Sequence, residues 1–172
     1  MQIIKLFTIF LLFFCIFSKN SFAEKYIPKV SINGSGLNVP RMVSLKKVPV
    51  YMRTGPGLKY PIKYEYNKAH YPMNIIAEFN NWRKVNTINN IKGWIHTSLL
   101  SSLKTGLIIE TTILKKTPFD KSKSIAKLLP NLLVEIKNCN EIWCKILIIK
   151  NQSYTGWVKK RLIWGSTKNK IN

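Results

Sequence analysis

Few side chains in this sequence could carry out covalent chemistry. A nucleophile–base pair needs a cysteine or serine beside a histidine, and the 172 residues include three cysteines and only two histidines, His70 and His96. We place His70 in a turn and His96 on the surface of a strand. Carboxylates paired at a catalytic spacing, a metalloprotease motif, a phosphate-binding loop and a dinucleotide fingerprint are all missing from the sequence. It therefore predicts a protein with no catalytic residues, no metal and no cofactor.

Residues 1–23 have the composition of a secretory signal peptide. Lys5 precedes an apolar run over residues 6–17, and a polar stretch with small residues leads to a cleavage site before Glu24. The apolar run of 12 residues is shorter than the roughly 20 of a membrane-spanning helix, and an uncleaved anchor is the alternative. We expect an exported protein, periplasmic or secreted, with no transmembrane span after cleavage.

The two cysteines outside this signal, Cys139 and Cys144, indicate a disulfide. An even number of cysteines in an exported chain favours a bridge. The alternative is half of a metal site, but the nearest histidine, His96, is distant in the sequence and there is no second cysteine pair.

The chain is strongly basic. Removal of residues 1–23 takes away two of the 28 Lys and Arg and none of the 7 Asp and Glu, which leaves a net charge of +19. Such a charge favours an anionic partner such as an envelope glycopolymer, acidic lipid head groups or nucleic acid. Lysines outnumber arginines by 24 to 4, and lysine lacks the planar fork that reads base edges, so specific nucleic-acid recognition is disfavoured. An A+T-rich genome would also enrich lysine but would not remove acidic residues, and we expect the charge to be in part functional.

Four of the five tryptophans indicate an internal duplication. Trp82 is followed by Trp94 and Trp143 by Trp157, and corresponding tryptophans lie 61 and 63 residues apart. Each half contains short strand-like runs separated by turn residues, with no long stretch at helical period. Closing such strands into small barrels removes exposed edges. We therefore predict an all-β fold of two small barrels in tandem after the signal peptide. A flexible arm covers 24–40, the barrels cover 41–102 and 103–165, and a basic tail covers 166–172. Helical turns at 97–100 and 160–163 stand near the ends of the two barrels.

The same offset pairs the cysteines with two charged residues. Subtracting 61 from Cys139 and Cys144 gives Glu78 and Arg83, which flank the corresponding hairpin turn. We expect facing positions to hold an ion pair in the first unit and a disulfide in the second, because cross-strand neighbours lie about 4.5–5.5 Å apart at Cβ. The exposed ion pair would contribute at most about 1 kcal/mol. Strict alternation from Ile136 puts Cys139 on the other face, so the bridge requires a bulge or an irregular turn.

Three segments of the first half resemble the bacterial SH3 (SH3b) family. They are Val50–Gly57, similar to the family's N-x-R-x-G-P element, Asn81–Val85, similar to G-W-x-K-V, and Gly93–Leu100, similar to G-W-V-x-x-x-x-L. The second half keeps the latter two as Trp143–Ile146 and Gly156–Leu162 but lacks Arg-x-Gly-Pro, so it is expected to have lost whatever that loop does. The combination of a signal, two such repeats and a cysteine pair is similar to exported SH3-like proteins of alphaproteobacteria.

The resemblance implies that the two all-β units are SH3-like barrels in tandem. It also implies recognition, often of cell-wall peptides, and no catalysis. We expect the ligand near the loop over residues 54–61, where amphipathic tyrosines beside one arginine suit a groove for an extended peptide. The candidate ligand-binding residues are Tyr51, Arg53, Tyr60, Tyr64, Tyr66, Trp82 and Trp94. For the four repeat tryptophans, Trp82, Trp94, Trp143 and Trp157, a place in the barrel core is nevertheless favoured over a ligand platform.

The leading hypothesis is a non-enzymatic exported protein that binds cell-wall peptide (peptidoglycan) or an envelope protein partner through its first unit. Its lysines would add non-specific adhesion to an anionic glycopolymer or lipid surface. One alternative is a secreted basic effector that binds acidic host surfaces or nucleic acid non-specifically. Another is an accessory or targeting subunit of a separate wall hydrolase.

Overall fold

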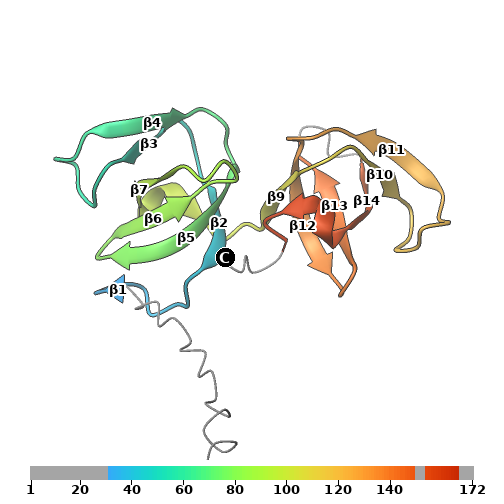
Figure 1. The fold of residues 1–172 in the computed structure, drawn as a ribbon, viewed down its shortest axis with the longest axis horizontal. Helices are drawn as coiled ribbons and strands as arrows, with labels where there is room; N and C mark the ends of the chain where they lie inside the picture. Colours follow the sequence, from blue (N-terminus) through green and yellow to red (C-terminus); the bar gives the residue numbers. More distant parts are fainter. Residues whose placement is uncertain (1–30, 150–153, 167–172) are drawn as a thin grey trace, which may run out of the picture.

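The computed structural model describes residues 31–149 and 154–166 (Figure 1). The predicted signal peptide, the first part of the arm, the loop at 150–153 and the end of the basic tail lie outside the described residues. Apart from two three-residue 3₁₀ turns, every regular element in the described ranges is a β-strand. The predicted all-β fold is therefore confirmed, and Figure 1 shows the strands gathered into two bodies.

The strands fall into two sets that follow each other along the chain. The first set is β1 (Ser31–Ile32), β2 (Arg41–Leu45), β3 (Val50–Arg53), β4 (Ile62–Tyr66), β5 (Pro72–Phe79), β6 (Trp82–Asn86), β7 (Lys92–His96) and β8 (Leu100–Ser101). The second set is β9 (Thr105–Ile108), β10 (Thr112–Lys115), β11 (Ser124–Leu128), β12 (Leu133–Cys139), β13 (Trp143–Ile148), β14 (Thr155–Lys159) and β15 (Ile163–Trp164). The 3₁₀ turns η1 (Thr97–Leu99) and η2 (Lys160–Leu162) stand just before the last strand of each set, where helical turns were predicted.

The two sheets have the same topology. The strand order is β4-β3-β7-β6-β5-β2-β8 in the first and β11-β10-β14-β13-β12-β9-β15 in the second. Each strand of one unit thus has a counterpart at the same place in the other. The short β1 is additional and pairs in parallel with β5. The predicted duplication is confirmed.

Each unit has its own core. It is built from the inward-facing residues, which alternate along each strand with outward-facing ones. The first core consists of Leu45, Val50, Met52, Met73, Ile75, Val85 and Ile95. The second consists of Ile108, Leu114, Leu128, Val134, Ile136, Cys144, Ile146, Ile148, Val158, Leu162 and Ile163. Two separate cores are the expected result for two units that each close their own sheet.

The expectation that the repeat tryptophans are buried in the barrels is correct for Trp143, which is 7% exposed, and wrong for Trp82, Trp94 and Trp157. Trp82 pairs with His96 across β6 and β7, while the neighbouring pair Arg83 and Ile95 points inward. Trp82 and Trp94 therefore lie on the outer face of the sheet and are only half-buried. The register of the second unit places Trp143 and Trp157 likewise. Trp143 is nearly covered but still lies outside the core cluster.

The predicted disulfide between Cys139 and Cys144 is present, and the cysteines face each other across β12 and β13. A register shift between Ile136 and Asn138 supplies the irregularity that strict alternation required. Glu78 and Arg83 face each other at the corresponding place on β5 and β6. The matched positions therefore hold a bridge in one unit and an ion pair in the other.

The expectation that this ion pair is exposed is wrong. The Glu78 side chain is 0% exposed, and Oε1 lies 3.0 Å from Arg83 Nε and also contacts Arg41 Nη2. Its oxygens accept hydrogen bonds from Ser35 N at 2.7 Å and Ser35 Oγ at 2.9 Å. Burial alone would raise the pKa of Glu78, but the hydrogen bonds from Arg41 and Ser35 and the charge of Arg41 outweigh it and lower the pKa to about 2.

The described part of the N-terminal arm lies against the first unit, which differs from the flexible segment that we expected. β1 pairs with the end of β5, and Ser35 caps the buried carboxylate of Glu78. A Cβ on Gly34 would collide with Ser31 Oγ and with Glu78 Oε2, so only glycine allows this close approach. The arm is held in place because the buried carboxylate takes hydrogen bonds from it.

Candidate functional site

The loop between β3 and β4, over residues 54–61, is held together by Arg53. Its Nη1 donates to the carbonyl oxygens of Leu58 at 3.1 Å and Tyr60 at 2.8 Å. Backbone hydrogen bonds from Thr54 N to Pro61 O and from Tyr60 N to Gly57 O close the loop. Arg53 therefore stabilises the loop from inside, and its guanidinium is already engaged by backbone oxygens.

The predicted tyrosines do not form one cluster. Tyr64 and Tyr66 pair with Met52 and Val50, whose side chains enter the core, whereas Tyr51 pairs with Glu65 on the opposite face of the hairpin. The ring of Tyr60 lies against Gly55, where a Cβ would collide with it. The structure thus separates Tyr51 from Tyr64 and Tyr66.

Tyr64 and Tyr66 begin an aromatic row along the inner side of β4. The ring centroids of Tyr64 and Tyr66 are 6.5 Å apart, and those of Tyr66 and Tyr71 are 5.9 Å apart. Burial, followed by the neighbouring hydroxyls of Tyr71 and Tyr64, raises the pKa of Tyr66 to about 12. Among the described strands β4 pairs only with β3, so it is an edge of the sheet. The row thus offers aromatic surface beside a strand edge to which a further strand could pair.

The two candidate tryptophans lie on the outer face, apart from this row. Trp94 is flanked by Lys84 on β6 and by Arg53 on β3, with Lys84 Nζ 6.0 Å from the ring centroid. Trp82 meets the ring of His96 edge-on at 5.4 Å. The seven predicted residues therefore fall into separate groups: the inner row of Tyr64 and Tyr66, the loop pair Arg53 and Tyr60, and the outer-face residues Tyr51, Trp82 and Trp94.

The second unit keeps the backbone of the loop with different side chains. The hydrogen bonds from Lys116 N to Lys123 O and from Ser122 N to Phe119 O repeat those of residues 54–61 after a shift of 62. Lys115 Nζ takes the role of Arg53 and donates to Ser122 O at 3.1 Å. Absence of Arg-x-Gly-Pro thus changes the side chains of the loop but not its backbone path.

Two residues that contact each other inside the loop differ together between the units: Gly55 and Tyr60 in the first correspond to Thr117 and Ser122 in the second. Thr117 Oγ1 donates to Ser122 Oγ at 2.7 Å, where the first unit packs Tyr60 on Gly55. The aromatic row is not repeated either, because residues Ala126 and Leu128 of β11 stand where Tyr64 and Tyr66 stand in β4. The two units therefore share a scaffold and differ in the surfaces that it carries.

A pocket of about 500 Å³ lies over Trp143 in the second unit. It is formed by the loop after β10 and the hairpin turn between β12 and β13, and its lining includes Phe119 and Ile142. Phe119 and Ile142 were not among the residues predicted to bind a ligand. They could have been recognised in the sequence because each is a large apolar residue in a turn, where polar residues are usual.

The sequence matches the bacterial SH3 domain family twice, over residues 46–102 and 111–165. The chain belongs to the bacterial SH3 domain family. Each match falls within one of the two sheets and omits β1 and β2 of the first and β9 of the second. The resemblance noted in the sequence is confirmed. No curated protein matches the chain significantly.

Similar solved structures include NlpC1 and NlpC2 from Trichomonas vaginalis, each with 16% sequence identity and TM-scores of 0.34 and 0.33. The matches cover 76% and 74% of this chain and 48% of each of those chains. An NlpC/P60 family protein from Bacillus cereus matches with 14% identity and a TM-score of 0.32, over 71% of this chain and 55% of that one. This chain thus spans about half the length of these structures.

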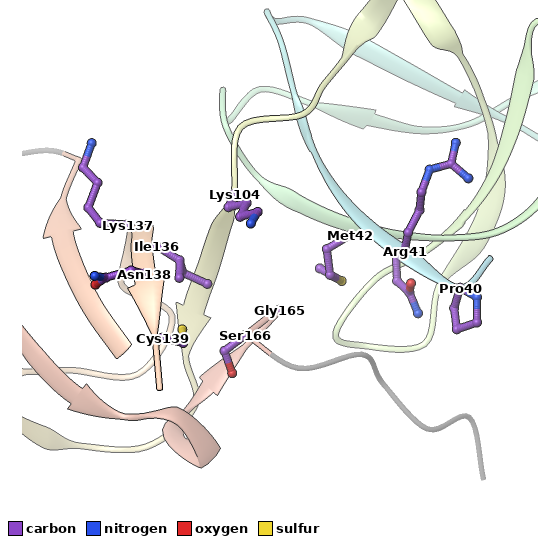
Figure 2. Close-up of a pocket in the computed structure, with 11 residues that line it drawn as sticks. Pro40, Arg41, Met42, Lys104, Ile136, Lys137, Asn138, Cys139, Gly165 and Ser166 are labelled. Carbon is purple, nitrogen blue, oxygen red and sulfur yellow. The ribbon is translucent and has the colours of Figure 1, made fainter. Parts of the chain in front are cut away.

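A second cavity, of about 420 Å³, lies between the two bacterial SH3 units. Figure 2 shows Met42 of the first unit and Ile136 of the second pointing into the space between the units, while the Arg41 side chain points away from it. The lining also includes Lys104, Lys137, Asn138, Cys139 and Ser166. Arg41 contacts Glu78, and Lys137 Nζ lies 2.6 Å from Glu135 Oε1. Lys104 has no such carboxylate partner in the described ranges. Of the three cations that line the cavity, Lys104 is thus the one that is not paired with a carboxylate among the described residues.

The described residues hold no group of three or more histidine, cysteine, aspartate or glutamate side chains that could bind a metal ion. Both cysteines of the second SH3 unit are engaged in the bridge. Nor do residues 31–149 and 154–166 contain a helix with the length and apolar character needed to cross a membrane.

Proposed function

We propose that the protein is an exported, non-enzymatic binding protein that recognises a cell-wall peptide or an extended segment of an envelope protein through its first SH3 unit. Bacterial SH3 domains are typically binding modules without catalysis, and this chain has two of them. The disulfide between Cys139 and Cys144 favours an oxidising compartment outside the cytoplasm. A periplasmic or secreted location is part of the proposal.

The observation that carries the proposal is the aromatic row on the free edge of the first sheet. An extended peptide can add to such an edge through main-chain hydrogen bonds, while alternate side chains of the strand supply specificity. Tyr64 and Tyr66 follow that alternation along β4, opposite Met52 and Val50, whereas a register shift places Ile62 opposite Arg53. Tyr64 is 42% exposed and can contact a ligand. The half-buried Tyr66 packs between the rings of Tyr64 and Tyr71 and so supports the Tyr64 ring.

The second unit supplies an internal comparison. Its edge strand β11 has the same pairing partner as β4 has in the first sheet, but carries Ala126 and Leu128 in place of the two tyrosines. Tyr66 packs against the first core, as Leu128 does in the second, so packing accounts for its ring. Tyr64 is 42% exposed and its counterpart is an alanine, so the fold does not require this ring and a role in binding explains it.

The net charge of +19 after signal removal supports a second contribution. Lysines spread over both units attract anionic glycopolymers or lipid head groups and speed association, with a strong dependence on salt. A purely electrostatic effector would show affinity that falls steeply with salt whatever the chemistry of the ligand. An accessory subunit of a wall hydrolase would instead copurify with that enzyme and bind no wall fragment by itself.

Sedimentation with purified peptidoglycan sacculi at about physiological salt tests the proposal. The double variant Tyr60→Ser, Tyr64→Ala introduces the side-chain types of the second unit, Ser122 and Ala126, on the first scaffold. We expect its affinity to fall by about tenfold or more, the usual loss when a tyrosine at the centre of an interface is truncated. Tyr154→Ala, at a tyrosine of the second unit with 41% exposure, is the matched control and should bind as the parent does.

Tyr51→Ala tests which face of the β3–β4 hairpin binds the ligand. Tyr51 is as exposed as Tyr64 but lies on the outer face, so its loss should leave binding unchanged. Unchanged binding by the Tyr60→Ser, Tyr64→Ala variant would refute the edge-strand site. Loss of binding by Tyr51→Ala alone would move the ligand to the outer face.

A further inference from the structure

The two units differ most strongly at two turns that meet over one tryptophan. The matching loop hydrogen bonds align Phe119 with Gly57. The bonds from Thr97 N to Asn81 O and from Lys160 N to Ile142 O align Ile142 with Asn81. A glycine and an asparagine in the first unit are thus replaced by two large apolar side chains in the second.

These two side chains are not needed to build the fold. Phe119 is 68% exposed and Ile142 is 62% exposed, so neither adds to the core. The turns that carry them form the same backbone hydrogen bonds in the first unit without them. Exposed apolar side chains that converge on one place are typical of interaction sites.

Side-chain contacts hold the two turns that form the pocket. Trp143 lines the pocket, and Lys159 Nζ lies 5.5 Å from the centroid of the Trp143 ring. Lys159 is itself held by Asp120 Oδ1 at 2.7 Å. The hairpin turn is fixed by Asn140 Oδ1, which accepts hydrogen bonds from Ile142 N at 3.0 Å and Trp143 N at 2.6 Å. Because its two turns are held in this way, the pocket can accept an apolar side chain with little reorganisation.

The rim of the pocket is acidic on a basic protein. Asp120 and Glu141, two of the seven acidic residues in the chain, both line it. Asp120 is engaged by Lys159, whereas the exposed carboxylate of Glu141 has no ion-pair partner within the described residues. A cation brought by a ligand would therefore find a counterion here, while most of the surface would repel it.

We propose that this pocket is a docking site for a protein partner, and that it takes a segment in which a large apolar side chain stands next to a lysine or arginine. The apolar side chain packs between Phe119 and Ile142 on Trp143, and the cation pairs with Glu141. The site lies on the second unit and is independent of the aromatic row on β4. The two units would then bind different ligands, and the protein would link the ligand of the first unit to a protein partner.

Two capped tetrapeptides, Gly-Phe-Lys-Gly and Gly-Phe-Glu-Gly, are suitable probes at millimolar concentration in ¹⁵N NMR. The lysine peptide should shift the indole signal of Trp143 and the amide signals of Phe119, Asp120 and residues 140–142. We expect it to bind about fivefold more tightly than the glutamate peptide, the upper range for one exposed ion pair. Glu141→Gln should reduce that preference to about twofold or less.

Exposed positions allow variants that do not disturb the core. Phe119→Ala with Ile142→Asn should abolish the shifts, because Asn is the residue that the first unit carries at that turn. Leu58→Ala, at a 78% exposed apolar residue of the first loop, is the matched control and should leave them unchanged. Tyr60→Ser with Tyr64→Ala should also leave them unchanged, which separates this site from the proposed wall-peptide site. Absence of the shifts, equal affinity for both peptides, or persistence of the shifts in the Phe119→Ala, Ile142→Asn variant would each overturn the proposal.

Discussion

Replacement of Glu78 by glutamine tests the buried ion pair that anchors the arm. The change keeps the shape of the side chain but removes its charge, and it leaves the guanidinium of Arg83 buried without a counterion. Loss of one partner from a buried pair costs about 3–5 kcal/mol. We expect the lower end, about 3 kcal/mol, because Arg83 also donates to Asn80 O at 2.7 Å and Trp82 O at 3.1 Å.

The effect should be confined to the first unit. For a unit of about 60 residues each kcal/mol shifts Tm by roughly 4–8 °C, so the expected fall is about 12–24 °C. Thermal unfolding followed by NMR separates the units, since the indole signals of Trp82 and Trp94 report on the first and those of Trp143 and Trp157 on the second. Glu65→Gln, at an exposed glutamate of the same unit, is the control and should cost less than about 0.5 kcal/mol.

The pH dependence of stability gives a second measurement of the same interaction. The pKa of Glu78 is lowered in the folded state from 4.5 to about 2, so its stabilisation is complete above about pH 4.5 and is lost as the pH falls toward about 2. The difference corresponds to about 3 kcal/mol, the same size as the loss that we expect for Glu78→Gln. The parent should therefore lose first-unit stability over this range, and Glu78→Gln should not. A cost below about 1 kcal/mol in the variant, with an unchanged acid response, would show that the pair behaves as an exposed one.

Two further predictions concern the differences between the units. Reduction of the bridge between Cys139 and Cys144, which are five residues apart, should lower the stability of the second unit by about 2 kcal/mol and leave the first unchanged, as denaturant unfolding with and without reductant would measure. An equal effect on both units would contradict their independence. Gly55→Thr alone should destabilise the first unit by about 1–3 kcal/mol, because the new side chain collides with the Tyr60 ring. Adding Tyr60→Ser should recover most of that loss in the same assay by recreating the hydrogen bond of Thr117 and Ser122; an additive loss in the double variant would refute this coupling.

The placement of the seven predicted site residues shows what strand alternation can and cannot supply. The sequence brings Tyr51, Tyr64 and Tyr66 near one loop, and all three do flank it. Alternation then separates them, because the pairing of β3 with β4 puts Tyr51 opposite Glu65 and Tyr64 opposite Met52. That register, and the bulge after Met52, are properties of the paired strands and are not visible in either strand alone.

Arg53 and the tryptophans illustrate a second limit. An arginine beside tyrosines is compatible with ligand binding, yet the carbonyl oxygens that engage Arg53 become available only when the loop folds back over it. Apolar tryptophans in a strand favour a core, yet Trp82 and Trp94 lie on the outer face because Arg83 and Ile95 occupy the inner one.

The sequence by itself determined the duplication, the all-β class and the facing pairs of Glu78 with Arg83 and Cys139 with Cys144. These features depend on the order and spacing of residues along the chain, which a repeat displays directly. Only the tertiary structure decided that Glu78 is buried, that the Gly34 segment covers it, and that Phe119 and Ile142 meet over Trp143. Burial and convergence depend on which distant segments cover a given surface, and Ser35 reaches Glu78 from 43 residues away.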